Sequence, residues 1–454
     1  MSVFGVYGVK NASSLIYYGL HALQHRGQEG AGMVTFDENG EACRYRGMGL
    51  VNEVFNPGNL ASLHGNMGIG SVRYANVSKG GVDNVQPTFF RHHSGDFAIA
   101  SDGCLVNSEE IRNYLEAKGT LFNSATDSEL LAHLIKKNSN KPRIFPIMDA
   151  LNMMEGSFTF LILTKNRIYA CRDKNGFKPL AIGKLGDGYV VSSETCAFDL
   201  VGAEFIRDVE PGEIVTIDAH GIRSRKYSQI QHRYMCAMEY IYFARPDSDI
   251  DGCNVHAYRK ESGRRLYREC PADADIVVGV PDSSLSAAMG YSEESGIPYE
   301  MGLIKNKYVG RTFIQPSQDM REKGVKMKLS AIRSIVNGKR IVLVDDSIVR
   351  GTTSIKIIKL LRDAGATEVH VRIASPRMTN PCFYGVDTST YEELLCSRRN
   401  VEQARQVIGA DSLGYLSPES TIQSCPDRTE MCLACFTGKY PTNIYVHETK
   451  KEEE

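Results

Sequence analysis

Short runs of apolar residues, bounded by turn-forming residues, recur along the first half of the chain. Four of these runs have the alternating or β-branched composition typical of strands, at residues 97–100, 158–163, 189–191 and 214–217. Two other stretches repeat apolar residues at helical spacing: residues 14–24, and a segment that begins with Asp127 as its N-cap. The pattern predicts a sandwich of two sheets with two helical stretches.

The second half has a different pattern, in which strands and helices alternate. Residues 274–280, 341–344 and 368–373 are strand-like runs, and helical spacing occurs in residues 284–292 and after Ser354. The run at 341–344 is continuous, which is typical of a strand covered on both faces in a parallel sheet. This half is therefore predicted to have an α/β architecture, in which ligands bind at the carboxyl ends of strands.

The change of pattern divides the chain into two predicted domains. A chain of 454 residues is too long for a single core. The polar segment 224–232 lies between the two patterns and is a plausible boundary. We predict a first domain over residues 1–228 and a second over residues 229–454.

Composition limits the classes of function. The chain has 53 basic and 54 acidic side chains, so no nucleic-acid partner and no anionic membrane surface are expected. It has neither a run of about 18 apolar residues nor a basic segment followed by an apolar one at its start, so we expect a cytoplasmic protein. Its 12 cysteines are then expected to be reduced or to bind metal.

The stretch IVLVDDSIVRGTTS, residues 341–354, joins a buried strand, two adjacent carboxylates and a hydroxyl-rich turn before a helix. The N–H groups of such a turn, with the hydroxyls at 352–354, suit a phosphate monoester. Asp345 and Asp346 would repel phosphate, so we expect them to face neutral hydroxyls of the ligand or a Mg²⁺ ion. A phosphorylated sugar meets both requirements. The alternative is an ordinary strand–helix turn with exposed acids.

This stretch resembles the 5-phosphoribosyl-1-pyrophosphate (PRPP) motif of type I phosphoribosyltransferases, in the form found in the amidophosphoribosyltransferase family. The resemblance extends to YYGLHALQHRGQEGAGM, RDVEPGEIV, EYIYFARPDS, VPDSS, KNKYVGRTFIQPSQ and CLACFTGKYP. It implies an α+β N-terminal-nucleophile domain, an αββα sandwich similar to class II glutamine amidotransferases, followed by an α/β type I phosphoribosyltransferase domain. It also implies the first step of purine synthesis, in which nitrogen from ammonia or glutamine displaces pyrophosphate from PRPP.

The resemblance implies roles for residues of the second half. Asp345 and Asp346 hold the ribose hydroxyls and, with Ser283, the Mg²⁺ shell. Lys305 and Arg311 belong to a lid over the pyrophosphate, although from charge alone their segment also fits a solvated loop. The 5-phosphate binds the loop residues Arg350, Gly351, Thr352, Thr353 and Ser354. The lid's basic continuation is Arg321, Lys326 and Lys328.

One cysteine pair has the spacing of metal ligands. Cys432 and Cys435 form a C-x-x-C motif, which fits zinc, an iron–sulfur cluster, a redox dithiol or two unligated thiols. Cys425 is the local candidate for a further ligand. The family resemblance points instead to Cys236 and Cys382, which would complete a 4Fe–4S site.

The first half departs from its family at the glutaminase site. The family begins with a cysteine nucleophile, whereas this chain has Met1, whose thioether cannot attack an amide. Exposure of Ser2 is an alternative, but its register turns it to the other face of a strand. The family's oxyanion-hole asparagine is Asp102 here, so only the N–H of Gly103 remains. We therefore expect an impaired glutaminase, although its expected glutamine ligands, Arg73 and Asp127, are present.

The resemblance also implies purine nucleotides as feedback inhibitors and a homo-oligomer, either a dimer or a tetramer. Two other functions fit part of the sequence. One is a non-catalytic protein that senses PRPP or nucleotides, and the other is a phosphoribosyltransferase with a nucleobase as acceptor. The lid-like segment disfavours the first, and the amidotransferase-like first half disfavours the second.

Overall fold

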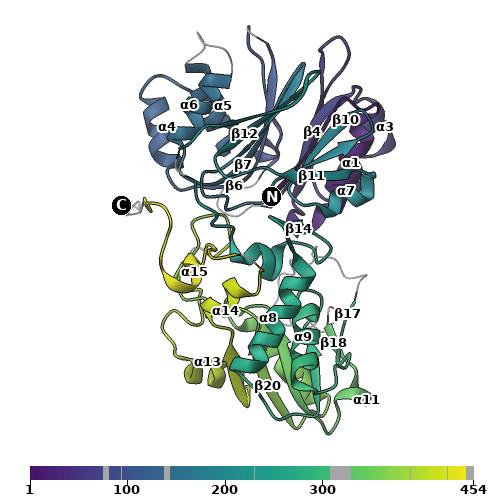
Figure 1. Ribbon diagram of the computed structural model, residues 1–454, viewed down its shortest axis with the longest axis vertical. Coiled ribbons are helices and arrows are strands. Elements are labelled where there is room, and N and C mark those ends of the chain that lie inside the picture. Colours follow the sequence, from purple (N-terminus) through teal and green to yellow (C-terminus); the bar gives the residue numbers. More distant parts are fainter. Residues whose placement is uncertain are drawn as a thin grey trace.

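The computed structural model describes residues 1–74, 81–93, 95–137, 144–229, 231–306, 329–388, 390–426 and 428–445. Its amino-terminal half lies above its carboxyl-terminal half in Figure 1. The amino terminus lies at the end of the upper half that faces the lower half (Figure 1). Residues at the start of the chain are therefore close to the junction of the two halves.

Two antiparallel sheets form the amino-terminal half. Their strand orders are β11-β9-β10-β1-β4-β2-β3 and β13-β12-β8-β7-β6-β5. Val3, Ile69 and Leu161 belong to the fully buried core that the two sheets share. The strands of the first sheet are β1 (Ser2–Tyr7), β2 (Gly30–Phe36), β3 (Ala42–Met48), β4 (Met67–Arg73), β9 (Ala181–Leu185), β10 (Gly188–Ser192) and β11 (Glu204–Asp208). Those of the second are β5 (Thr88–Phe90), β6 (Phe97–Leu105), β7 (Gly156–Thr164), β8 (Arg167–Arg172), β12 (Glu213–Asp218) and β13 (Gly221–Lys226).

Helices cover the outer faces of both sheets, which confirms the predicted αββα sandwich. Ile16 of the first helix packs in one core with Phe4 of β1, and Gly19 allows this approach because a Cβ there would lie 2.6 Å from the Phe4 ring. The first sheet carries α1 (Ala12–Ala22), α2 (Val51–Val54), α3 (Pro57–Ala61) and α7 (Cys196–Val201). The second carries α4 (Ser108–Glu116), α5 (Asp127–Lys137) and α6 (Ile144–Met153). The helix expected at residues 14–24 is thus α1, followed by the 3₁₀ turn η1 (Gln24–Arg26).

A parallel sheet with the order β16-β19-β20-β21 forms the centre of the carboxyl-terminal half. Ile341 and Leu343 pack in the core with α12, whereas Val342 and Val344 pack in the core with α9. The prediction of a strand covered on both faces is therefore confirmed. The strands are β16 (Ile276–Gly279), β19 (Arg340–Asp345), β20 (Glu368–Ile373) and β21 (Ser412–Tyr415), and the main helices are α8 (Val255–Glu269), α9 (Leu285–Ser295), α12 (Thr352–Asp363) and α13 (Val401–Ile408).

Short elements connect the two halves and form the tail. The π-helix η3 (Glu239–Phe243) and the hairpin of β14 (Asp249–Ile250) and β15 (Cys253–Asn254) precede α8. The tail carries α14 (Pro418–Gln423) and α15 (Ala434–Thr437), and it returns to the junction, where Tyr445 donates to Glu155 of the upper half at 3.2 Å (Figure 1). The remaining elements are η2 (Val82–Asn84), β17 (Leu303–Lys305), β18 (Leu329–Ala331) and α11 (Arg333–Val336). Among the described residues, every helix falls short of the length and apolar character of a membrane span.

Candidate active site

A cavity of about 580 Å³ opens at the carboxyl ends of β16 and β19. These strands are parallel neighbours, with Gly279 opposite Val344, so the loops that follow them meet at one edge of the sheet. The cavity is lined by residues 280–283 and 345–354 of these loops, and by Lys305. The sheet thus gathers most of the predicted PRPP residues around one space.

The two adjacent carboxylates lie buried at the base of this cavity. The hydroxyl of Ser284 donates to Asp345 at 3.0 Å, and the hydroxyls of Ser283 and Ser347 donate to Asp346. Burial raises the pKa of Asp345, and the nearby Asp346 carboxylate raises it further; burial also raises the pKa of Asp346. A bound cation, or hydroxyl groups of a ligand, would stabilise the ionised form of both carboxylates and so lower their pKa values again.

The predicted phosphate loop ends at the first turn of α12. Gly351 has φ +76°, which allows the chain to enter the helix, and a Cβ there would lie 2.9 Å from Leu395. Thr352 and Thr353 begin the helix beside the cavity, and Ser354 is buried. The first N–H groups of a 12-residue helix therefore point toward this space. Arg350 lines the cavity and pairs with Glu393 at 2.8 Å.

One of the predicted lid residues, Lys305, lies at the cavity. Lys305 lies at the end of β17 and forms an exposed ion pair with Asp282 at 2.6 Å. The other predicted lid residues, Arg311, Arg321, Lys326 and Lys328, lie outside the described residues.

Sequence reasoning missed several residues of the cavity wall. Residues 242–246 line it beside His25 and Arg259. Arg259 is buried, and its guanidinium donates to the carbonyls of Tyr240 at 2.7 Å and Ala244 at 2.8 Å. The EYIYFARPDS segment was evident in the sequence, but its local pattern gave no reason to assign it to this wall.

A second cavity, of about 290 Å³, adjoins the first at the junction of the two halves. Met1 and Asp102 lie at this cavity, and both cavities share a wall that includes Tyr242, Phe243 and Val349. The Met1 amino group donates to the carbonyl of Arg26 at 3.0 Å and lies 3.8 Å from an Asp102 carboxylate oxygen. Burial lowers the pKa of this amino group to about 6, although Asp102 opposes the change.

A buried ionic network surrounds Met1. The Arg26 guanidinium lies 3.2 Å from Asp102, 2.7 Å from Glu194 and 2.7 Å from Glu239. Lys178 pairs with Glu239 at 2.8 Å. Burial by itself would raise the pKa of Glu239, but the cations of Arg26 and Lys178 lower this pKa to about 2. The Asp102 carboxylate thus interacts with the cations around it as a hydrogen-bond acceptor. An oxyanion hole needs a hydrogen-bond donor at this position.

The other predicted glutaminase residues lie on strands and a helix near this position. Gly103 has φ +127°, and a Cβ there would lie 2.2 Å from the carbonyl oxygen of Ser157, so only glycine fits. Arg73 ends β4 and lies 3.9 Å from Glu29. Asp127 is the first residue of α5, and its carboxylate accepts from the Leu105 N–H at 3.1 Å; burial raises its pKa to about 6. Ser2 is fully buried within β1 and does not line the Met1 cavity, as its register predicted.

The four cysteines of the predicted cluster site lie together at the base of the tail. The backbones of Cys236 and Cys432 pair in an isolated parallel β-bridge. Burial raises the pKa of all four thiols, and Cys382, Cys236 and Cys432 raise that of Cys435 further. In the described ranges, no group of three or more histidine, cysteine or acidic side chains is arranged to hold a metal ion. Cys425, the local alternative, lies instead beside Cys253.

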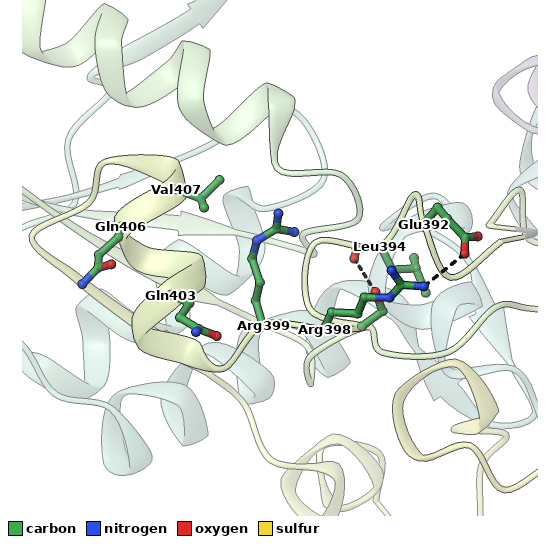
Figure 2. A pocket seen from close by; sticks show the side chains of 8 residues that line it. Glu392, Leu394, Arg398, Arg399, Gln403, Gln406 and Val407 are labelled. Carbon is green, nitrogen blue, oxygen red and sulfur yellow. Dashed lines mark hydrogen bonds and ion pairs between the residues drawn. The ribbon is translucent and has the colours of Figure 1, made fainter.

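A further cavity, of about 670 Å³, lies beside α13 and is lined by none of the predicted residues (Figure 2). Its two arginines are already engaged: Arg398 pairs with Glu392 at 3.4 Å, and Arg399 donates to the Leu395 carbonyl at 3.5 Å.

Comparisons with known proteins match both halves of the chain. A model of the glutamine amidotransferase domain matches residues 77–199, and one of the phosphoribosyl transferase domain matches residues 261–379. The chain is 54% identical over 449 residues to amidophosphoribosyltransferase of Bacillus subtilis (strain 168), covering 98% of this chain and 94% of that protein. It is 48% identical over 453 residues to amidophosphoribosyltransferase of Staphylococcus aureus (strain Mu50), covering 98% and 92%.

Two solved structures are similar over nearly the whole chain. One is a glutamine PRPP amidotransferase from B. subtilis complexed with ADP and GMP, with TM-score 0.93, 53% identity and coverage of 98% of both chains. The other is described as the allosteric regulatory enzyme of purine biosynthesis, with TM-score 0.94, 53% identity and coverage of 98% of this chain and 97% of that chain.

Proposed function

Because the chain belongs to the amidophosphoribosyltransferase family, we propose that it forms 5-phosphoribosylamine and pyrophosphate from PRPP with ammonia as the effective nitrogen donor. The observation that supports the PRPP half is the cavity shared by the carboxylate pair and the first turn of α12. Its shape and chemistry suit a ligand with a phosphate at one end and hydroxyls beside it.

The residues of this cavity mainly bind and orient PRPP. The first turn of α12 holds the 5-phosphate, and Asp345 with Asp346 accepts hydrogen bonds from the ribose hydroxyls. These two carboxylates and the Ser283 hydroxyl are hard oxygen donors, which fit Mg²⁺ shared with a substrate. When bound, that ion neutralises charge on the departing pyrophosphate. Lys305 and Arg311 would stabilise the same charge from the lid side.

The PRPP reaction is tested with purified protein, PRPP, Mg²⁺ and ammonium, by measurement of pyrophosphate. Release that requires both PRPP and ammonium supports the proposal. PRPP binding without release would indicate a sensing protein instead.

The glutaminase half is proposed to be impaired. The Met1 side chain supplies no nucleophile, and the Asp102 carboxylate would repel an oxyanion formed beside it. The cavity beside these two residues still adjoins the PRPP cavity. The test compares glutamine-dependent with ammonium-dependent product formation, on protein whose first residue has been identified by mass spectrometry. Equal turnover with glutamine in a chain that starts at Met1 or Ser2 would contradict the proposal.

A 4Fe–4S cluster is proposed at Cys236, Cys382, Cys432 and Cys435. Cys236, Cys432 and Cys435 are buried and Cys382 is partly buried beside them, and four neighbouring thiols are the ligand set that such a cluster needs. Iron and sulfide analysis of anaerobically purified protein tests this proposal, and protein that contains zinc alone would refute it. Since a related structure is complexed with ADP and GMP, we further propose that purine nucleotides inhibit this enzyme. From the family to which the chain belongs, we also propose that it acts as a homo-oligomer.

A further inference from the structure

One histidine lies where the two cavities of the candidate active site adjoin. His25 belongs to the turn η1 that follows α1, and it lines both the PRPP cavity and the cavity beside Met1. The other residues that line both cavities are Tyr242, Phe243, Ser347, Val349 and Arg350. Side chains of these types keep one protonation state at neutral pH, whereas histidine gains and loses a proton there. Of the described residues shared by the two cavities, His25 is therefore the one suited to moving a proton.

A buried carboxylate fixes the orientation of the His25 ring. Its Nε2 lies 2.7 Å from an oxygen of Glu194, whose side chain is fully buried. The same carboxylate accepts from Arg26, from the Arg245 N–H and from the Ser248 hydroxyl. Burial by itself would raise the pKa of Glu194, but His25 and Arg26 hold this pKa well below its usual range. The ionised carboxylate therefore accepts the Nε2 proton, which leaves Nδ1 as the basic nitrogen of a neutral ring.

The proposed reaction, on which this inference rests, needs a base close to the PRPP cavity. At neutral pH ammonium is almost wholly protonated, as a lysine side chain is, and it has no lone pair with which to attack C1 of PRPP. The Met1 side chain cannot release ammonia from glutamine, so the nitrogen would enter as ammonium. Asp345 and Asp346 already serve the ribose and the metal ion in the proposed reaction. A separate group has to take the proton.

We propose that His25 takes a proton from ammonium, and that the resulting ammonia attacks C1 of PRPP in the adjoining cavity. The proton moves from ammonium to Nδ1 and then to solvent, since 28% of the His25 side chain is exposed. The ammonia lone pair forms the bond from nitrogen to C1 while the bond from C1 to the pyrophosphate oxygen breaks, and pyrophosphate leaves with that electron pair. The new –NH₃⁺ group loses its extra proton to water. Glu194 acts through His25 and is a positioning residue.

Several charged groups influence how readily His25 takes up a proton. The Glu194 carboxylate favours the protonated ring, whereas cations at the same cavities oppose it. The cations are Arg26, Arg245 and Arg350, and the cavity beside Met1 adds the Met1 amino group and the Asp102 carboxylate. The Met1 amino group is the rival base, so the test has to separate it from His25.

The test measures pyrophosphate release from PRPP and Mg²⁺ at several ammonium concentrations, between pH 6.5 and 9.5. His25→Gln should lower kcat/KM for total ammonia by about 10²-fold at pH 7, which is a usual contribution of a general base. At pH 9.5 this variant should approach the parent protein, because much of the ammonia is then already unprotonated. Its KM for PRPP should stay unchanged, since a glutamine amide can still donate to Glu194. His21→Gln, on the exposed side of α1, is the matched control and should keep the parent profile.

A second variant separates loss of the base from a change of shape. His25→Ala should regain part of its lost rate at pH 7 when imidazole is added, because imidazole supplies the missing base. A rate that falls by the same factor at every pH, without rescue by imidazole, would show that His25 only supports the structure. An unchanged profile in His25→Gln would overturn the proposal and leave the Met1 amino group as the base. Absence of ammonium-dependent release from the parent protein at every pH would instead refute the proposed function, and this inference with it.

Discussion

At the scale of single residues, the PRPP cavity concentrates its chemistry on two carboxylates. Asp345 accepts from the Ser284 hydroxyl and Asp346 from the Ser283 hydroxyl, and burial makes both carboxylates costly to ionise without a ligand. Removal of one charge should therefore impair binding of both the ribose and the metal ion.

Asp346→Asn should reduce pyrophosphate release by a factor of about 10² to 10³, since a preorganised charge in the site is lost. The measurement is pyrophosphate formation from PRPP, Mg²⁺ and ammonium. Asp363→Asn, at the exposed end of α12, is the matched control and should retain the parent rate. Similar rates in both variants would remove Asp346 from its assigned role.

The glutaminase site offers a gain-of-function test, because two residues account for its expected defect. Met1→Cys, exposed as the first residue after removal of an initiator methionine, should act together with Asp102→Asn. The double variant should exceed each single variant by about 100-fold in glutamine-dependent turnover, since attack and oxyanion stabilisation act as a unit. Each rate is normalised to the ammonium-dependent rate of the same protein. Equal activity in Met1→Cys alone would show that Asp102 does no harm.

At the scale of elements, the tail is the segment whose position depends on the cysteines. Cys432→Ser should release iron and sulfide and should make the segment after α14 more susceptible to proteases, because the cluster holds it to the domain. Iron and sulfide analysis and limited proteolysis under anaerobic conditions provide the measurement. Cys43→Ser, on β3 of the other half, is the control. A tail equally protected in both variants would contradict this role of the cluster.

A strand end and a hairpin meet at Asp208, the last residue of β11. Burial raises the pKa of Asp208 to about 7, from 3.8 for the free side chain, and Asp251 of the β14–β15 hairpin raises it further. The folded protein therefore holds this proton more tightly than the unfolded chain, and stability falls as the pH rises from about 4 to 7.

Asp208→Asn removes this effect. It should stabilise the protein at pH 8 by about 2 kcal/mol, given partial exposure of the side chain, and should change little at pH 4. Thermal unfolding at both pH values checks the prediction, with Asp187→Asn in an exposed turn as control. A stabilisation that is equal at both pH values would exclude ionisation of Asp208 as its cause.

At the scale of the whole molecule, ion pairs join the two halves. Glu239 of the carboxyl-terminal half accepts from Arg26 and Lys178 of the amino-terminal half, and all three are buried. Asp251 accepts from Arg172 at 2.9 Å in the same manner. The two cavities lie beside this junction, so its geometry determines how they adjoin.

Glu239→Gln should lower the free energy of unfolding by about 3 kcal/mol, because it removes the buried carboxylate that pairs with both Arg26 and Lys178. Glu210→Gln breaks an exposed pair with Arg233 and should cost about 0.5 kcal/mol or less. Denaturant unfolding of both variants distinguishes these outcomes. If the two variants lose similar stability, the buried network does not hold the halves together.

Local patterns in the sequence were enough for the two architectures and for one side of the PRPP cavity. The continuous apolar run before Asp345 requires a strand covered on both faces, and Gly351 and the hydroxyls after it require a turn into a helix. Both conclusions depend on residues adjacent in the chain, where spacing alone determines which side chains share a face. The sequence also showed that Met1 and Asp102 differ from the family's nucleophile and oxyanion-hole residues. This needed no structure, because the residue type alone determines which reactions a side chain can perform.

Only the tertiary structure decided which distant residues meet. Nothing near Arg259 or residues 242–246 indicated that they form a wall of the cavity, since that contact depends on how α8 packs against the sheet. The assignment of Cys425 also needed the fold: its sequence position favoured the cluster, whereas the packing of α14 on α8 brings it to Cys253. Sequence spacing determines local geometry, but contacts between segments more than a hundred residues apart are set by the packing of whole elements.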